Sequence, residues 1–198
     1  MATLFLTSTG LSASVVHQAF VQEIKNINRT GKVLIITTAS NQGPSNPNIQ
    51  SGYQKLVDLG FSDVHFFDLL SDDISTLKQA KIIYVCGGNT FRLLKAMRDT
   101  GADQIIQNFY HQSDGIYIGV SAGSLVVGQS IASAVGHDEN KVHLADLTGL
   151  RLINDILFVH YDDSQANEIL ELEQNFPKVR TLTNTQALII NGNNEQLI

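Results

Sequence analysis

The chain of 198 residues is long enough for one domain with a sizeable core. Its formal net charge of -6, with no basic run or basic face, argues against a nucleic-acid or membrane-surface partner. The single cysteine, Cys86, excludes an internal disulfide framework and is typical of a reducing compartment. Because no stretch has the length of a transmembrane helix and the N-terminus lacks the basic region of a signal peptide, we expect a soluble, cytoplasmic protein.

Apolar runs alternate with amphipathic stretches along the first 120 residues. The run from Lys32 to Thr38 is rich in β-branched residues, as expected for a strand covered on both faces. Repeated β–α alternation at these lengths predicts an α/β fold, a parallel sheet with helices on both faces. We expect strands over residues 3–7, 32–38, 63–67, 81–86 and 115–120, and helices over residues 12–28, 46–60, 73–79, 90–98 and 102–111.

The pattern changes after the first 125 residues. Short, mixed segments are expected over residues 131–135, 142–147 and 150–153, followed by a strand over 155–160 and a helix over 165–175. Three further short strands are expected near 179–183, 187–190 and 196–198. Because no internal repeat, linker or low-complexity segment is visible, residues 1–198 are predicted to form a single α/β domain.

A glycine-rich turn follows the apolar run at residues 115–120. Its sequence, Gly119-Val120-Ser121-Ala122-Gly123, fits the G-x-S-x-G pattern of a nucleophile elbow, in which a strand turns sharply into a helix and exposes a serine hydroxyl. Side chains at the two glycine positions would collide in such a turn. The pattern arises by chance with a probability of roughly 0.1 in a chain this long. The alternative to a nucleophile is therefore an ordinary turn with Ser121 as a helix N-cap.

A serine hydroxyl is a poor nucleophile until a neighbouring base takes its proton. His160 ends an apolar strand at the edge of the sheet where Ser121 is expected, which makes it the candidate base. His137 and His143 lie in irregular segments and are weaker candidates. A position inside a helix, inside a strand or near a helix C-terminus favours structural roles for the other three histidines: His17, His65 and His111.

The third member of a catalytic triad orients the histidine and stabilises its charged form. Asp138 and Glu139 lie between Ser121 and His160 in the chain and would give the order serine, acid, histidine. Other acidic residues compete for this role, and the sequence does not choose among them: Asp146, Asp155, Asp162 and Asp163.

Acyl-transfer chemistry also needs backbone donors directed at the developing oxyanion. The N–H of Ala122, directly after the candidate nucleophile, is the first candidate. The second is Gly87-Gly88 at another strand end, where the missing side chains let the backbone approach a substrate. The alternative there is a plain turn in which Asn89 or Thr90 caps the next helix. No spacing of Cys86 with histidines and acids matches a zinc pattern, so we expect no metal.

Three segments stand out in combination: Cys-Gly-Gly-Asn-Thr-Phe at 86–91, Gly-Val-Ser-Ala-Gly-Ser at 119–124 and Val-His-Tyr at 159–161. Together they resemble the serine peptidases of family S51, which includes dipeptidase E and the cyanophycinases. The match in order and spacing runs from the first strand to about residue 175. This combination is much more specific than G-x-S-x-G alone.

The resemblance implies a parallel-sheet three-layer sandwich like the class I glutamine amidotransferase domain, a flavodoxin-like fold with a nucleophile elbow. It assigns the nucleophile to Ser121 and the base to His160. It assigns the oxyanion donors to Gly88 and Ala122. The acid of the family lies in a stretch that is about two residues longer here, which leaves Asp138 and Glu139 nearly tied, with a slight preference for Glu139.

The resemblance also bears on substrate choice. In the aspartyl dipeptidases, an arginine beyond the catalytic histidine is expected to bind the aspartate side chain of the substrate. Residues 162–168 here are acidic and contain no arginine, and a buried carboxylate without a cationic partner is costly. Strict Asp-X specificity is therefore not expected. Gly87 and Asn89 are expected to contact the substrate.

We therefore expect a serine exopeptidase that hydrolyses small peptides through an acyl-enzyme, needs no cofactor and acts as a monomer or homodimer. One alternative is an α/β-hydrolase esterase with the same elbow, although an HGGG-type oxyanion motif is absent. The other is a non-catalytic module in which Gly87-Gly88 contacts a small ligand. A nucleotide is a weak choice of ligand because G-x-G-x-x-G and Gly-Lys-Ser/Thr are both missing.

Overall fold

The computed structural model describes residues 1–198. The strands are β1 (Thr3–Thr7), β2 (Val33–Ile36), β3 (Val64–Phe67), β4 (Ile82–Val85), β5 (Ile116–Val120), β6 (Ile156–Val159), β7 (Val179–Leu182), β8 (Ala187–Asn191) and β9 (Asn194–Leu197). The α-helices are α1 (Ser14–Glu23), α2 (Pro47–Asp58), α3 (Thr90–Thr100), α4 (Ala102–Gln112), α5 (Ala122–Leu125) and α6 (Ala166–Glu173). Short 3-10 helices cover Gly43–Ser45, Ile74–Gln79, Ala132–Ala134 and Asp163–Gln165.

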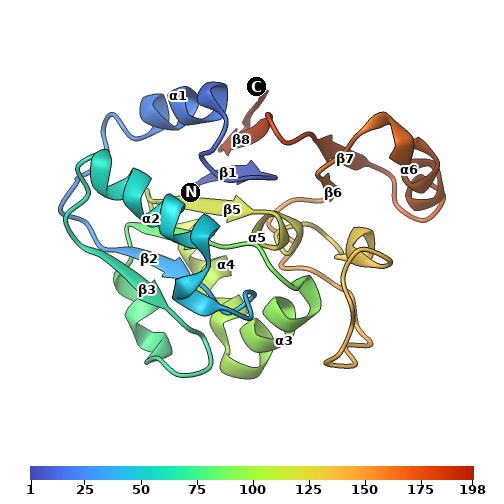
Figure 1. Cartoon of the computed structure of the whole chain (residues 1–198), viewed down its shortest axis with the longest axis horizontal. Coiled ribbons are helices and arrows are strands. Elements are labelled where there is room, and N and C mark those ends of the chain that lie inside the picture. Colours follow the sequence, from blue (N-terminus) through green and yellow to red (C-terminus); the bar gives the residue numbers. More distant parts are fainter.

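A seven-stranded sheet in the order β3-β2-β4-β5-β1-β8-β9 forms the centre of the molecule (Figure 1). Neighbouring strands are parallel from β3 to β1, and β8 and β9 add an antiparallel edge. The predicted α/β class is confirmed. Because Thr7 pairs in register with Val120, β1 and β5 end side by side, and the residues that follow them, Ser8 and Ser121, leave the sheet together.

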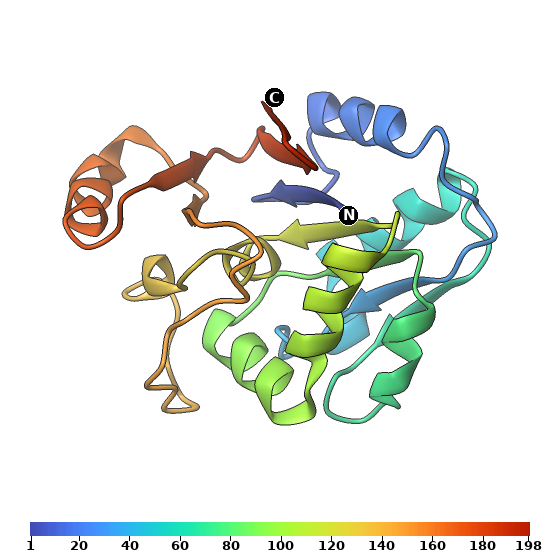
Figure 2. The ribbon, with the colours of Figure 1, turned by 180° about the vertical axis from the view of Figure 1, so that it is seen from behind.

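Each central strand is buried on both faces because successive side chains point to opposite sides of a sheet. Leu4 and Leu6 of β1 enter the core beneath α3, α4 and α5, whereas Phe5 between them enters the core beneath α1 and α2. The two views show these helices on opposite sides of the sheet (Figures 1 and 2). The three layers of the expected sandwich follow from this alternation.

Strands β6 and β7 form a separate two-stranded parallel sheet. It lies with α6 beyond the carboxyl ends of the central parallel strands (Figures 1 and 2). The strand expected just before His160 is present, but it lies outside the central sheet. Arg180 of β7 forms ion pairs with Asp155, just before β6, and with Glu195 of β9. This arginine therefore links the small sheet to the edge of the central one.

Two regions are less regular than the sequence pattern indicates. Helix α1 ends at Glu23, before the predicted limit at residue 28, since Asn26-Ile27-Asn28 has low helix propensity. The mixed segments expected between 131 and 153 contain one 3-10 helix and isolated bridges such as Ser130 with Thr148. None of the helices is long and apolar enough to span a bilayer.

Candidate active site at the carboxyl edge of the sheet

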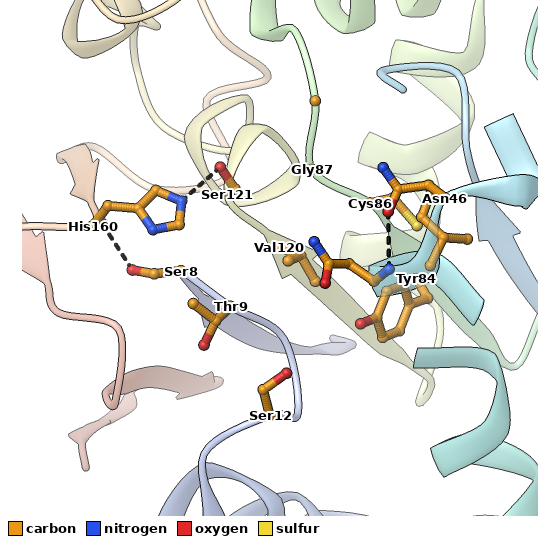
Figure 3. Close-up of a pocket in the computed structure, with 13 residues that line it drawn as sticks. Ser8, Thr9, Ser12, Asn46, Tyr84, Cys86, Gly87, Val120, Ser121 and His160 are labelled. Carbon is orange, nitrogen blue, oxygen red and sulfur yellow. Dashed lines mark hydrogen bonds between the residues drawn. The ribbon is translucent and has the colours of Figure 1, made fainter. Parts of the chain in front are cut away.

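A pocket of about 450 Å³ lies at the carboxyl ends of β1, β4 and β5. Its lining comes from the loops after these strands, from the start of α2 and from His160 after β6 (Figure 3). Ligand sites in open α/β sheets form at this edge. The structure brings Gly87, Gly88 and Ser121 into one crevice.

Ser121 lies between β5 and α5 in a backbone conformation that side-chain-bearing residues rarely adopt, with φ 50° and ψ -113°. Such a conformation costs on the order of 1–3 kcal/mol and is concentrated at functional turns. The Ser121 N–H donates to the Thr7 carbonyl at 2.9 Å, which holds the turn against the end of β1. The hydroxyl caps no helical N–H, so the ordinary N-cap role does not describe it.

Glycines make this turn sterically possible. A Cβ at Gly123 would lie 2.2 Å from the Val85 carbonyl oxygen, and a Cβ at Gly119 would lie 2.7 Å from the Gly123 carbonyl oxygen. Both distances are far below van der Waals contact, as expected for an elbow. A Cβ at Gly87 would lie 3.1 Å from the Ser121 Cβ. The backbone after β4 therefore passes directly beside the serine.

His160 lies within hydrogen-bond distance of Ser121. Its Nε2 is 3.0 Å from the Ser121 Oγ, and its Nδ1 is 2.6 Å from the Oδ1 of Asn184 in the β7–β8 turn. An imidazole with its proton on Nδ1 donates to the Asn184 oxygen, and its Nε2 lone pair then faces the serine hydroxyl. The two hydrogen bonds therefore fit the tautomer that a general base needs.

Hydroxyl groups after β1 hold His160 and Asn184 in place. The Ser8 hydroxyl donates to the Leu182 carbonyl at 2.9 Å and accepts the His160 N–H at 3.0 Å. The Thr9 hydroxyl donates to the Asn184 carbonyl at 2.8 Å. His160 itself has a positive φ of 59°, a conformation that persists only where the surroundings enforce it. His160 therefore follows a strand of the small sheet but is held in place by hydroxyl groups at the end of the central sheet.

The structure does not bring Asp138 or Glu139 to the imidazole of His160. The Asp138 Oδ2 accepts the Thr90 N–H at the start of α3, at 2.8 Å. The Glu139 carboxylate is largely exposed and pairs with Lys141 at 3.0 Å. Asn184 occupies the Nδ1 side of the imidazole, the position that the sequence analysis reserved for an acid.

The candidate oxyanion donors are both available for new contacts, because the N–H groups of Gly88 and Ala122 make no hydrogen bond within the protein. Gly88 has φ 142°, and a Cβ there would lie 2.2 Å from the Ala39 carbonyl oxygen, so only glycine fits. Ala122 follows Ser121 as the first residue of α5. Gly88 also lines the pocket beside Ser121.

The two residues expected to contact substrate differ in position. Gly87 lines the pocket, whereas Asn89 does not. The Asn89 Oδ1 accepts the Arg92 N–H at 2.9 Å and so caps α3, and its Nδ2 donates to the Glu139 carbonyl at 2.8 Å. Asn89 therefore shapes the loop around Gly88 from outside the pocket, in the capping role that the sequence analysis kept as an alternative.

The cysteine beside the site is inert. Burial raises the pKa of Cys86 to about 12, so its thiol stays protonated near neutral pH and supplies no competing nucleophile. A second, smaller pocket of about 190 Å³ also borders Ser121 and His160, with His137 and Asp138 in its lining. The serine and histidine therefore border two cavities.

Sequence reasoning missed Asn184, Ser8 and Thr9. No motif surrounds Asn184, which lies in a turn of ordinary composition, so the sequence offers no signal for its role. Ser8 and Thr9 could have been found, because they follow the first strand directly and the carboxyl ends of parallel strands meet at one edge of a sheet.

The fold and the site together define an α/β protein with a nucleophile elbow. The sequence matches the model of peptidase family S51 over residues 4–198, and the chain belongs to this family. It is 30% identical over 203 residues to the uncharacterized peptidase Lmo0363 of Listeria monocytogenes, covering 97% of this chain and 96% of that protein. It is also 30% identical over 178 residues to the uncharacterized peptidase Lin0382 of Listeria innocua, covering 86% and 82% of the two chains.

Solved structures have the same architecture. A crystal structure from Listeria monocytogenes EGD-e, named as a candidate peptidase E, superposes with a TM-score of 0.82 at 27% identity and covers 100% of this chain and 98% of its own. A peptidase from an acI-B1 Actinobacterium superposes with a TM-score of 0.73 at 20% identity, covers 100% of this chain and 87% of its own, and supports the fold alone.

Proposed function

We propose that this peptidase is of the serine type, with Ser121 as nucleophile and His160 as general base. The observation that carries the proposal is the 3.0 Å separation between the Ser121 Oγ and the His160 Nε2, which is within reach for proton transfer. The strained backbone of Ser121 and the unbonded N–H groups of Gly88 and Ala122 support it.

The reaction would proceed through an acyl-enzyme. His160 takes the hydroxyl proton as the Ser121 oxygen bonds to the peptide carbonyl carbon, and the Gly88 and Ala122 N–H groups bind the resulting oxyanion. The C–N bond then breaks, and the imidazolium returns its proton to the leaving amine. A water molecule then attacks the ester carbon and gives its proton to His160, which passes it to the Ser121 oxygen as the ester C–O bond breaks and the carboxylic acid product leaves.

Asn184 completes the triad in this proposal. Its side-chain oxygen fixes the Nδ1–H tautomer and the ring orientation of His160 through the 2.6 Å hydrogen bond. An asparagine does the same beside the histidine of cysteine peptidases of the papain type. Because the amide carries no charge, it stabilises the imidazolium less than a carboxylate would.

Short peptides are the substrates that fit this site best. The two cavities that border Ser121 have volumes of only about 450 Å³ and 190 Å³, which favours short peptides over an extended chain. We therefore propose an exopeptidase similar to dipeptidase E, without strict Asp-X specificity.

The test is hydrolysis of a dipeptide library by the wild-type protein and by Ser121→Ala and His160→Ala variants. We expect both variants to lose activity by about 10⁴-fold or more while their circular dichroism stays unchanged. His111→Ala removes an exposed imidazole at the end of α4 and serves as the control. Near-normal hydrolysis by purified Ser121→Ala would reject the proposal, and a phosphonate that reacts with serine should label Ser121 only while His160 is present.

A further inference from the structure

The lining of the larger pocket beside Ser121 contains no lysine, arginine, aspartate or glutamate. Nearby cations are engaged elsewhere. Lys55 of α2 donates to the Leu11 carbonyl at 2.9 Å, and Arg92 of α3 donates to the Asn41 side chain at 2.8 Å in a different cavity. A carboxylate bound in this pocket would therefore be removed from water without a cationic partner, which is strongly unfavourable.

Tyr84 of β4 supplies a buried polar group to the same pocket. The residue is only 4% exposed and its hydroxyl makes no hydrogen bond within the protein, whereas the equally buried Tyr117 donates to the Gly123 carbonyl at 2.7 Å. In Figure 3, Tyr84 lies across the pocket from His160, with its hydroxyl oxygen on the side of the cavity. Because this hydroxyl reaches the pocket and has no partner within the protein, it is free to donate a hydrogen bond to a bound group or to accept one from it.

Two glycines make room for this hydroxyl at the wall of the pocket. A Cβ at Gly10, in the loop after β1, would lie 2.7 Å from the Tyr84 hydroxyl oxygen, and a Cβ at Gly52 of α2 would lie 2.9 Å from it. Side chains at either position would therefore displace the hydroxyl. The remaining free polar groups of the pocket are also neutral, since Ser12 and Asn48 contribute a hydroxyl and an amide at its exposed rim.

We propose that this pocket selects a substrate residue with a neutral, hydrogen-bonding side chain, such as the carboxamide of asparagine, and that Tyr84 is the specificity-determining residue. The inference rests on the proposed peptidase function. Gly88 borders the pocket and is the proposed oxyanion donor, so the residue bound here is the one whose carbonyl Ser121 attacks.

Three substrate side chains that share the same branched arrangement of four non-hydrogen atoms separate the contribution of the hydrogen bond from that of charge. Asparagine both donates and accepts hydrogen bonds and pairs with the Tyr84 hydroxyl. Leucine has the same branched shape, is somewhat bulkier and leaves the hydroxyl unpaired, and sites built for a hydrogen bond discriminate against such analogues. Aspartate can pair with the hydroxyl but brings an uncompensated charge. The expected order of preference is asparagine, then leucine, then aspartate.

The experiment measures kcat/KM for Asn-Leu, Leu-Leu and Asp-Leu with the full-length protein. We expect kcat/KM for Asn-Leu to exceed that for Leu-Leu by about tenfold, the effect of one hydrogen bond, and we expect Tyr84→Phe to bring the ratio of the two values close to one. Tyr53→Phe is the matched control, because the Tyr53 ring packs on Phe66 away from the pocket. Preferred cleavage of Asp-Leu, or an equal loss on all three substrates in Tyr84→Phe, would overturn the inference.

Measurements of dipeptide binding test the specificity of the pocket independently of the proposed catalytic function. Calorimetry of the three dipeptides with Ser121→Ala, and with Ser121→Ala combined with Tyr84→Phe, measures selection without turnover. Tighter binding of Asn-Leu that weakens on loss of the Tyr84 hydroxyl supports the pocket assignment, even if the wild-type protein hydrolyses none of the peptides. Equal affinity for all three dipeptides rejects the assignment, even if Ser121 proves to be the nucleophile.

Discussion

At the scale of single residues, the most informative contact is the one between His160 and Asn184. A serine hydroxyl is harder to deprotonate than a cysteine thiol, so a triad with serine gains more from an anionic partner for its imidazole. Here the partner is a neutral amide at 2.6 Å. The amide can hold the tautomer and the ring orientation, but it leaves the imidazolium with less electrostatic support.

Substitution of Asn184 tests this positioning role through the pH dependence of kcat/KM. Asn184→Ala should lower kcat by about 100-fold or more, because the ring loses the contact that fixes its tautomer. In Asn184→Asp, the carboxylate stabilises the protonated imidazole, so the base stays blocked up to a higher pH. The acid limb of the profile should then move upward by about 1 pH unit. Superimposable profiles for Asn184→Asp and the wild-type protein would contradict the assignment.

At the scale of elements, the elbow depends on close approach between α5 and β4. Ser121 keeps its strained conformation because the helix after it is pressed against the end of β4, where Gly123 meets the Val85 carbonyl. Packed interiors leave little room for an added methyl group. The glycines of the motif therefore act through tertiary contact between two elements as well as through backbone freedom.

Gly123→Ala measures the value of this contact. The new Cβ would meet backbone atoms that cannot rotate away, so we expect a loss of about 1–3 kcal/mol in the free energy of unfolding. Displacement of α5 should also reduce labelling of Ser121 by a phosphonate. Gly60→Ala is the control, because Gly60 has φ 91° but no atom lies within 4 Å of the added Cβ. This substitution therefore introduces backbone strain without a steric collision. An unchanged urea midpoint for Gly123→Ala would show that the elbow can shift without cost.

At the scale of the whole molecule, the site is divided between two sheets. Ser121 follows β5 of the central sheet, whereas His160 follows β6 of the small one. Their separation of 3.0 Å therefore depends on how the sheets are joined. Arg180 contributes to this join through its ion pairs with Asp155 and Glu195, and these partners raise the pKa of the arginine despite the opposing effect of its partial burial.

Arg180→Met should therefore affect both stability and catalysis. We expect the free energy of unfolding to fall by about 1–2 kcal/mol, because the carboxylate of Asp155 is only 13% exposed and keeps a single partner. We also expect kcat/KM to fall as His160 loses its fixed distance from Ser121. Lys178→Met removes the exposed cation that pairs with the same carboxylate at 3.2 Å and should cost less than about 1 kcal/mol. Equal effects of the two substitutions in urea titrations would argue against a joining role for Arg180.

The amino-acid sequence by itself determined the elements and the two residues at the centre of the site. Alternation of β-branched runs such as Lys32 to Thr38 with amphipathic helices predicted the α/β class. A strand that is buried on both faces needs a continuous apolar run, and this run is visible in the local sequence. The glycine pattern around Ser121 and the strand end at His160 pointed to the candidate nucleophile and base for the same reason. These signals all lie within a few residues of the feature that they predict.

The tertiary structure alone decided which group meets the far side of the imidazole and which sheet carries the histidine. Asn184 is 24 residues from His160 in the chain and has no local motif, whereas Asp138, one of the two acids that the chain order suggested, is held by the first turn of α3. The hydroxyl of Tyr84 likewise has room only because glycines stand at positions 10 and 52, on two other segments. Such contacts are chosen by packing between distant segments, and a pattern of neighbouring residues does not encode them.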